Sequence, residues 1–249
     1  MCQTTHTGRL SQPRNRVLPL ELVLPRSGSV IAARHFEIII VFGCCVTIRQ
    51  RGKEKQMPSP IREVMAELEA RDRADRTDGT PHAMRLRAIA PEVGQLLLTL
   101  AISIRAVTIL EVGTSSGYST LWLSMAAART GGRITTFEVD PAKIALARRT
   151  FAAAGVESLV DLREGDGGRG LTGFTGRADL VFIDSEKDDY LRLLNVGIEA
   201  LRPGGLFVAD NLISHAAELE SFKTRVLADP RISGLVIPLG GGEFVAVRL

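Results

Sequence analysis

The chain has 249 residues, which is enough for one large domain or two small ones. Residues 1–56 hold nine Lys and Arg against three Asp and Glu, whereas residues 57–249 hold 22 against 25. The larger part is therefore mildly acidic, which excludes the basic footprint of a nucleic-acid-binding domain, and we expect no nucleic-acid partner. All three cysteines precede residue 57, so the larger part needs no disulfide and we expect a reducing, cytoplasmic setting.

Residues 1–56 differ in character from the rest of the chain, because prolines and arginines are scattered through them without a sustained period. Their one apolar run, Phe36 to Ile48, is interrupted by Glu37. It is also shorter than the roughly 20 residues of a membrane-spanning helix, so we expect no membrane association. Met57 opens a sequence suited to the start of a domain. We predict an atypical extension at 1–56, disordered or translated from upstream sequence, and a folded domain at 57–249.

Beyond residue 57 the pattern predicts two helices, followed by strands and helices in alternation. Pro60 suits the first position of a helix, and a second helix begins near Pro91. The expected strands are Val107–Val112, Arg133–Val139, Leu159–Arg163, Ala178–Ile183, Gly205–Ala209, Gly234–Pro238 and Phe244–Arg248. The expected helices between them are Ser119–Ala127, Pro141–Ala154, Lys187–Leu201 and Ala216–Leu227.

This alternation predicts an α/β fold with a doubly wound, mostly parallel, seven-stranded sheet. The expected strand at 178–183 is apolar nearly throughout, as a strand covered on both faces should be. The last two strands are joined by Leu239 to Gly242, which is short enough for an antiparallel hairpin. In open sheets of this kind, ligands bind at the carboxyl ends of the strands.

The most informative motif is Ile109 to Thr120, in which an apolar run containing Glu111 is followed by Gly113, Gly117 and a helical pattern. A strand that turns sharply into a helix presents free backbone N–H groups, and glycines let a ligand approach them closely. The dinucleotide fingerprint Gly-x-Gly-x-x-Gly is broken because Ser115 stands at its second glycine. The sequence Glu-x-Gly-x-x-x-Gly resembles the first motif of class I S-adenosylmethionine (SAM) methyltransferases.

Two further strand ends carry acids suited to an adenosine-containing ligand. Glu138 ends the second strand, where an acid accepts hydrogen bonds from ribose hydroxyls; the alternative is a solvated carboxylate. Asp140 precedes Pro141 and indicates a helix cap. The methyltransferase resemblance places Glu111 near the SAM amino group; the alternative is a buried acid that caps the turn. Asp166, in the sequence Gly-Asp-Gly, stands where the adenine of the ligand should lie; the alternative is an ordinary turn.

Polar residues also follow the fourth and fifth strands. Asp184 ends the fourth strand, and Asp210 and Asn211 end the fifth. Neighbouring strand ends would bring the three side chains to one rim, and oxygen ligands suit a hard cation such as Mg²⁺, Ca²⁺ or Mn²⁺. The alternative is that Asp210 and Asn211 cap the next helix.

The sequence Phe-Ile-Asp-Ser-Glu-Lys-Asp-Asp-Tyr, followed by Ala-Asp-Asn, resembles the cation-dependent O-methyltransferases that include catechol and caffeoyl-CoA O-methyltransferases. The likeness extends from Ala83 to Leu249. It implies Asp184, Asp210 and Asn211 as ligands of a divalent cation, Mg²⁺ first, and Lys187 as general base; alternatively, Lys187 is a solvated residue in the first turn of a helix. It also implies a homodimer. The donor site that it implies comprises Glu111, Gly113, Ser115, Gly117, Ser119, Glu138, Asp166 and Asp184.

The chain departs from the family on the side where the acceptor should bind. Relatives carry a longer insertion after the Asp-Asn pair, and Gly-Asp-Gly where this chain has Gly240 to Gly242. Met84 and Arg85 match a region that often borders the active site. We expect methyl transfer from SAM to a small hydroxylated, catechol-like acceptor. The alternatives are a metal-independent methyltransferase of the same fold, a NAD-binding oxidoreductase and a SAM-binding module without catalysis.

Overall fold

The computed structural model describes residues 32–33, 36–41, 45–50 and 60–249. The chain divides into two compact units, Met1–Gln56 and Met57–Leu249. In the first unit, β1 (Ala32–Ala33), β2 (Phe36–Val41) and β3 (Cys45–Gln50) form an antiparallel sheet. The predicted extension at 1–56 lies mostly outside the described residues, so its disorder and its origin stay predictions.

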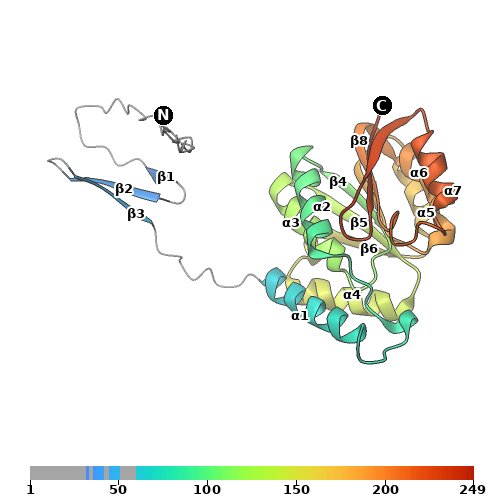
Figure 1. Ribbon diagram of the computed structural model, residues 1–249, viewed down its shortest axis with the longest axis horizontal. Helices are drawn as coiled ribbons and strands as arrows, with labels where there is room; N and C mark the ends of the chain where they lie inside the picture. Colours follow the sequence, from blue (N-terminus) through green and yellow to red (C-terminus); the bar gives the residue numbers. More distant parts are fainter. Residues whose placement is uncertain (1–31, 34–35, 42–44, 51–59) are drawn as a thin grey trace, which may run out of the picture. The chain divides into compact units, whose positions relative to one another are not determined.

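The second unit is built on one seven-stranded sheet in the order β6-β5-β4-β7-β8-β10-β9 (Figure 1). Its strands are β4 (Thr108–Val112), β5 (Arg133–Glu138), β6 (Val160–Glu164), β7 (Ala178–Ile183), β8 (Leu201–Ala209), β9 (Ile232–Ile237) and β10 (Glu243–Arg248). The pairings β6-β5, β5-β4, β4-β7 and β7-β8 are parallel. The last strand, β10, runs antiparallel to both β8 and β9. The predicted fold class is confirmed.

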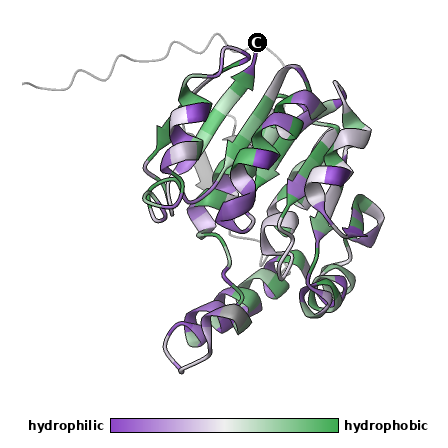
Figure 2. Ribbon diagram, turned by 90° about the vertical axis from the view of Figure 1, so that its right-hand side faces the viewer, coloured by the Kyte–Doolittle hydropathy of each residue, from purple (hydrophilic) through white to green (hydrophobic). Residues whose placement is uncertain are grey.

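Helices cover both faces of this sheet, and the apolar strands lie between them (Figure 2). The helices are α1 (Pro60–Asp75), α2 (Pro91–Ser103), α3 (Tyr118–Thr130), α4 (Pro141–Ala154), α5 (Gly167–Leu171), α6 (Tyr190–Ala200) and α7 (Glu220–Leu227). Successive strand residues point to opposite faces. Ile109 therefore packs in the core beneath α1–α4, whereas Leu110 packs in the core beneath α5–α7.

Several predicted boundaries were wrong. The helix expected from Lys187 begins at Tyr190, because Lys187–Asp189 forms a 3₁₀ turn. The helix expected from Ala216 begins at Glu220, and β8 begins at Leu201 rather than Gly205. The short helix α5 follows Asp166, whose side chain accepts a hydrogen bond from the Arg169 N–H and so caps a segment too glycine-rich to be predicted as helical.

The turn between β4 and α3 packs tightly against the neighbouring strand end. Gly113 has φ 100° and Gly117 has φ 86°. A Cβ atom at Gly113 would lie 1.9 Å from the carbonyl oxygen of Asp184, and one at Gly117 would lie 2.6 Å from the Phe151 ring. Both positions therefore require glycine, and the turn is in direct contact with the end of β7.

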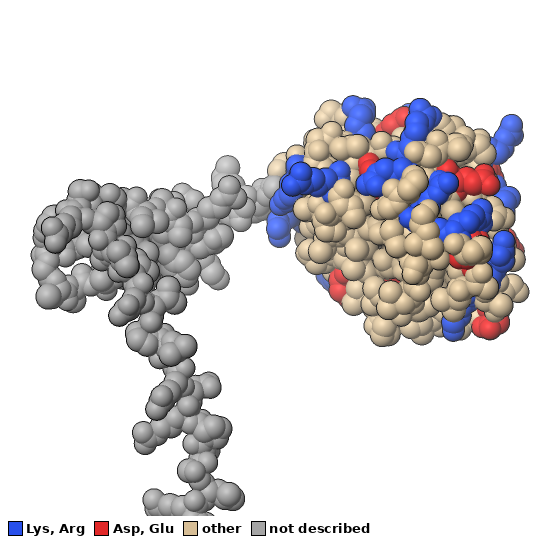
Figure 3. Space-filling model, turned by 90° about the horizontal axis from the view of Figure 1, so that it is seen from above, with Lys and Arg blue, Asp and Glu red and all other residues tan. Residues whose placement is uncertain are grey.

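Charged side chains of both signs are spread over the face of this unit that Figure 3 presents, with acidic groups among the Lys and Arg side chains. In the described ranges, no helix combines the length and the apolar character that crossing a membrane requires. The absence of nucleic-acid and membrane partners stays a prediction.

Candidate active site

A cavity of about 730 Å³ lies at the carboxyl ends of the central strands, which is within the usual size range of ligand pockets. Most of the predicted site residues line it, namely Gly113, Ser115, Glu138, Asp166, Asp184, Lys187, Asp210 and Asn211. Three predicted donor-site residues, Glu111, Gly117 and Ser119, are not among its lining residues. The structure therefore separates the predicted set into residues that a ligand can touch and residues behind them.

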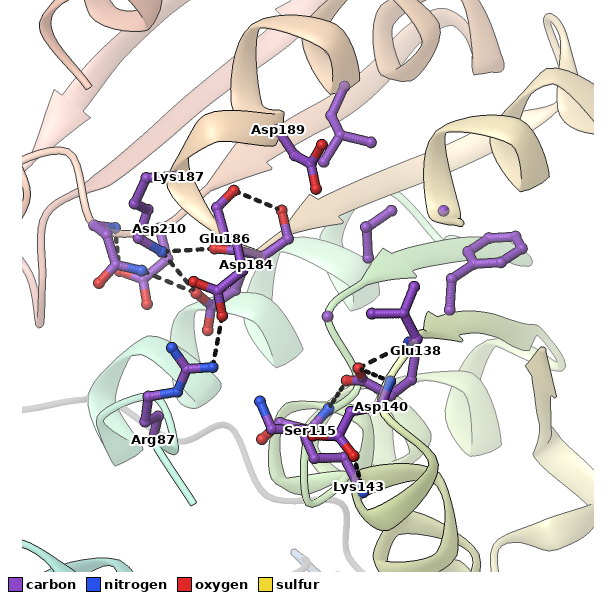
Figure 4. Close-up of a pocket in the computed structure, with 18 of the residues that line it drawn as sticks. Arg87, Ser115, Glu138, Asp140, Lys143, Asp184, Glu186, Lys187, Asp189 and Asp210 are labelled. Carbon is purple, nitrogen blue, oxygen red and sulfur yellow. Dashed lines mark hydrogen bonds and ion pairs between the residues drawn. The ribbon is translucent and has the colours of Figure 1, made fainter. Parts of the chain in front are cut away.

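Glu138 is held by backbone groups at the edge of the cavity (Figure 4). One of its carboxylate oxygens accepts a hydrogen bond from the Ser115 N–H at 2.8 Å, and the other accepts from the N–H groups of Val139 and Asp140 at 2.9 and 3.0 Å. The residue is buried, so it is not the solvated carboxylate of the alternative interpretation. Asp140 caps α4, as predicted. Glu138 thus ties the β4–α3 turn to the end of β5.

Glu111 lies beneath the turn and has no exposed surface. Its two carboxylate oxygens accept hydrogen bonds from the hydroxyls of Ser119 at 2.6 Å and Thr120 at 2.5 Å, both in the first turn of α3. Burial raises the pKa of Glu111 to about 7, although these hydroxyl donors favour the charged form. The structure therefore gives Glu111 the role of a buried acid at a helix start. A contact with the SAM amino group stays a prediction.

Asp166 combines a structural role with a position in the cavity wall. It caps α5, and its carboxylate pairs with the Arg192 guanidinium at 2.8 Å. The hydrogen bond from Arg192 lowers the pKa of Asp166, so that this carboxylate stays ionised. Its proposed contact with adenine stays a prediction.

Asp184, Asp210 and Asn211 meet at one rim, as the sequence predicts. The Asp184 N–H donates to the Val112 carbonyl, and the Asp210 N–H donates to the Ile183 carbonyl, so each follows its strand in register. The Asn211 side-chain amide donates to Asp184 Oδ1 at 2.9 Å. Helix α7 begins well beyond the Asp-Asn pair and has no side-chain cap, which rules out the capping alternative.

Lys187 reaches back to this rim from the 3₁₀ turn. Its Nζ lies 3.5 Å from Asp184 Oδ1 and donates to the Ser185 carbonyl at 2.9 Å and to the Tyr190 hydroxyl at 3.2 Å. The Tyr190 hydroxyl in turn donates to the Asp210 carbonyl at 3.1 Å. Only 13% of the Lys187 side chain is exposed. Lys187 is therefore a positioned amine beside the carboxylates rather than a solvated surface residue.

Sequence analysis did not single out Glu243, the first residue of β10, which is completely buried. Neither carboxylate oxygen has a hydrogen-bond partner in the described part of the chain. Burial and the adjacent carboxyl of Asp210 raise the pKa of Glu243 far above its ordinary value. Burial and Asp210 likewise raise the pKa of Asp184. The only signal in the sequence is an acid at the start of an otherwise apolar strand.

These residues fit a hard cation by their donor chemistry. The rim concentrates carboxylates that repel one another, and the unpartnered oxygens of Glu243 lie behind Asp210. The Asn211 amide oxygen accepts from the Ser214 hydroxyl at 3.1 Å, and a reversal of the amide would place this oxygen beside Asp184 Oδ1, where two acceptors need a cation between them. Among the described residues, no group of three or more His, Cys, Asp and Glu side chains is arranged to hold a metal ion. The predicted set has only two carboxylates, Asp184 and Asp210, and its third oxygen is that of the Asn211 amide.

Arg87 is a second residue that the sequence did not reveal, although its neighbours Met84 and Arg85 drew attention. Its Nη2 donates to Glu186 Oε1 at 2.8 Å across the cavity mouth (Figure 4). Its backbone φ of 52° is unusual for a residue other than glycine. Such a conformation costs about 1–3 kcal/mol, and an exposed ion pair contributes about 0–1 kcal/mol. The pair with Glu186 therefore does not account for the strain.

Residues 62–249 match the family model described as O-methyltransferase. A putative O-methyltransferase of Mycobacterium sp. (strain JLS) is 35% identical over 175 residues, covering 65% of this chain and 79% of the relative. A catechol O-methyltransferase of Niastella koreensis is 34% identical over 151 residues, covering 59% of this chain and 66% of the relative. The solved structure of the O-methyltransferase TomG from Streptomyces achromogenes, in complex with SAM, is similar with a TM-score of 0.63 and 26% identity, covering 75% of this chain and 89% of that one.

Proposed function

Because this chain belongs to the O-methyltransferase family, we propose that it transfers a methyl group from SAM to one hydroxyl of a small acceptor with two adjacent oxygens, with the help of a divalent cation. The observation that carries the proposal is the arrangement at the rim. The Lys187 amine lies 3.5 Å from Asp184, and Asp184 is hydrogen-bonded to Asn211 beside Asp210.

The donor occupies the part of the cavity lined by Gly113, Ser115 and Glu138. The name of the TomG structure, which holds SAM, supports this choice of donor. The ribose hydroxyls of SAM add hydrogen bonds to the Glu138 carboxylate, whose position the backbone already fixes. Asp166 receives the adenine side. Glu111, behind the turn, attracts the donor's ammonium group when its carboxyl is ionised.

Asp184, Asp210 and Asn211 would hold the cation, which when bound orients two adjacent acceptor oxygens and lowers the pKa of a hydroxyl. The acceptor is proposed to be catechol-like, and the relative from Niastella koreensis, which is named a catechol O-methyltransferase, supports this class. The connection after Asn211 lines this side of the cavity through His215 and Glu218.

Lys187 accepts the proton of the reacting hydroxyl. The Ser185 carbonyl and the Tyr190 hydroxyl hold Nζ in place, so the position of the amine that would take the proton is fixed. The oxygen then attacks the methyl carbon in line, the C–S bond breaks, and S-adenosylhomocysteine leaves. The protein contributes mainly position and charge.

The family match favours this enzyme over a NAD-binding oxidoreductase and over a module without catalysis. An experiment decides between this metal-dependent reaction and methyl transfer without a metal on the same fold. EDTA should abolish methylation of a catechol acceptor, and Mg²⁺ or Mn²⁺ should restore it. Full activity in EDTA would establish the metal-independent alternative.

Two variants separate the roles at the rim. Asp210→Asn should lose cation binding, measured by calorimetry, and should still bind SAM. Lys187→Met should bind SAM and the cation, and should turn over roughly 10²- to 10⁴-fold more slowly if Lys187 is the general base. Normal turnover of Lys187→Met would assign the proton to another group or to water.

We place the reaction in the reducing cytoplasm, since every cysteine precedes residue 57. A homodimer is proposed on the family resemblance alone, and measurement of the mass in solution tests it.

A further inference from the structure

Arg87 is held in its strained conformation from both sides. The Leu86 N–H donates to the Asp75 carboxylate at 3.1 Å, and the Leu86 carbonyl accepts from the Ser115 hydroxyl at 2.9 Å. On the other side, the Ala88 N–H donates to the Asp72 carboxylate at 3.1 Å. Helix α1 and the donor turn thus fix the backbone on both sides of Arg87. A strained residue that its surroundings hold in place is typical of a functional position.

The guanidinium of Arg87 is largely available to a ligand. Its bond to Glu186 uses one of five N–H donors, and its other nitrogens have no hydrogen-bond partner among residues 60–249. Other basic side chains of this wall are engaged differently: Arg76 pairs with Asp72, and Arg85 donates to the Thr80 carbonyl. After Lys187, the positive charge of Arg87 also opposes the rise in the pKa of Asp184.

Arg87 lines the same cavity as Lys187 and Asp184, and its side chain is more exposed than either of theirs. The exposed fraction of the side chain rises from 13% at Lys187 to 21% at Asp184, 33% at Arg87 and 72% at Glu186. An acceptor whose hydroxyl lies at Lys187 can therefore extend its other end toward Arg87 within the same cavity. Glu186 already presents a carboxylate to the guanidinium, which demonstrates the chemistry that this position accepts.

We propose that Arg87 determines acceptor specificity by binding a carboxylate carried by the acceptor on the side away from its reacting hydroxyl. The acceptor displaces Glu186, and the planar fork of the guanidinium receives both carboxylate oxygens. This inference rests on the proposed function, because it takes the acceptor to react beside Lys187.

The test compares 3,4-dihydroxybenzoate with its methyl ester, which has the same two hydroxyls and no charge. The wild-type protein should prefer the acid in kcat/KM. In Arg87→Gln the ratio of kcat/KM for acid over ester should fall roughly ten- to hundredfold, the effect of one lost charged hydrogen-bonding partner. Arg87→Lys should lie between the two, because it keeps the charge and loses the fork.

Two further variants exclude a merely structural effect. Arg85→Gln removes a charge from the same wall and should keep the wild-type ratio. Glu186→Gln removes the competing carboxylate and should raise the preference for the acid, a change that loss of a structural ion pair would not produce. An equal ratio in wild type and Arg87→Gln overturns the proposal and leaves the methyltransferase assignment intact.

Binding measurements keep the two proposals separate. If neither acceptor is methylated, the proposed function fails, and titration of both compounds into the protein with S-adenosylhomocysteine and Mg²⁺ decides the role of Arg87. Tighter binding of the acid than of the ester, lost in Arg87→Gln, supports the carboxylate site. Equal or undetectable binding of the two compounds overturns it.

Discussion

Glu111 is a carboxylic acid enclosed on all sides, and its protonation is therefore coupled to folding. Its pKa of about 7 in the folded protein lies above the ordinary value of 4.5. Between these values the folded protein binds more protons than the unfolded chain, so the free energy of unfolding falls as pH rises through this range. Above pH 7 the ionised, buried carboxylate costs the fold up to about 3 kcal/mol.

The prediction is that Glu111→Gln stabilises the ligand-free protein at pH 8 and loses this advantage at pH 4.5. The amide can accept from one of the Ser119 and Thr120 hydroxyls and donate to the other, so the hydrogen bonds at the start of α3 survive. Urea unfolding at both pH values measures the difference. A gap between variant and wild type that does not change with pH would contradict the buried-charge argument.

Glu138 offers a prediction about donor binding. In Glu138→Ala the affinity for SAM should weaken by roughly 1.5–3 kcal/mol, because the ribose loses a charged acceptor and three backbone N–H groups lose theirs. Calorimetric titration measures this. Asp140→Ala is the control: it removes the cap of α4 and should cost stability more than SAM affinity. Unchanged affinity in Glu138→Ala removes Glu138 from the donor site.

At the scale of the element, the β4–α3 turn and the end of β7 act as one unit. Gly113→Ala should destabilise the protein by roughly 2–5 kcal/mol, because the new Cβ would lie 1.9 Å from the Asp184 carbonyl and φ is 100°. Gly131→Ala is a matched control, since it also has a positive φ and its Cβ would meet nothing within 4 Å. Thermal unfolding of both variants separates steric contact from backbone strain. Equal losses would show that the contact with Asp184 contributes nothing.

The strands could be predicted from the sequence because short runs rich in apolar residues alternate with helical patterns. The same regularity located Asp184, Asp210 and Asn211, since parallel strands end at a shared edge. Helix starts were less accurate, because a 3₁₀ turn and an α-helix have similar patterns at Lys187. Arg87 and Glu243 could not be found in this way. The position of Arg87 depends on a loop that α1 and the β4–α3 turn hold in place. The role of Glu243 depends on Asp210, which follows the neighbouring strand β8.

At the scale of the whole molecule, Met57–Leu249 forms a compact unit of its own, and the described cavity lining and both described cores lie within it. We therefore predict that a chain beginning at Met57 keeps the thermal stability and the SAM affinity of the full chain. Differential scanning calorimetry with and without SAM compares the two. Aggregation or a lower melting temperature of the shorter chain would show that residues 1–56 contribute to the fold.

The last strand to be synthesised, β10, lies inside the sheet between β8 and β9. The ribosome makes β4 to β8 first, so the donor turn and the Asp-Asn pair emerge while the place beside β8 is still empty. Glu243 and the loop that accepts hydrogen bonds from the N–H groups of Ile213 and Ser214 arrive last. The acceptor side of the cavity is therefore completed only after the residues of the donor side have been synthesised. Premature termination in β9 would leave a fragment that lacks Glu243 and exposes the edge of β8.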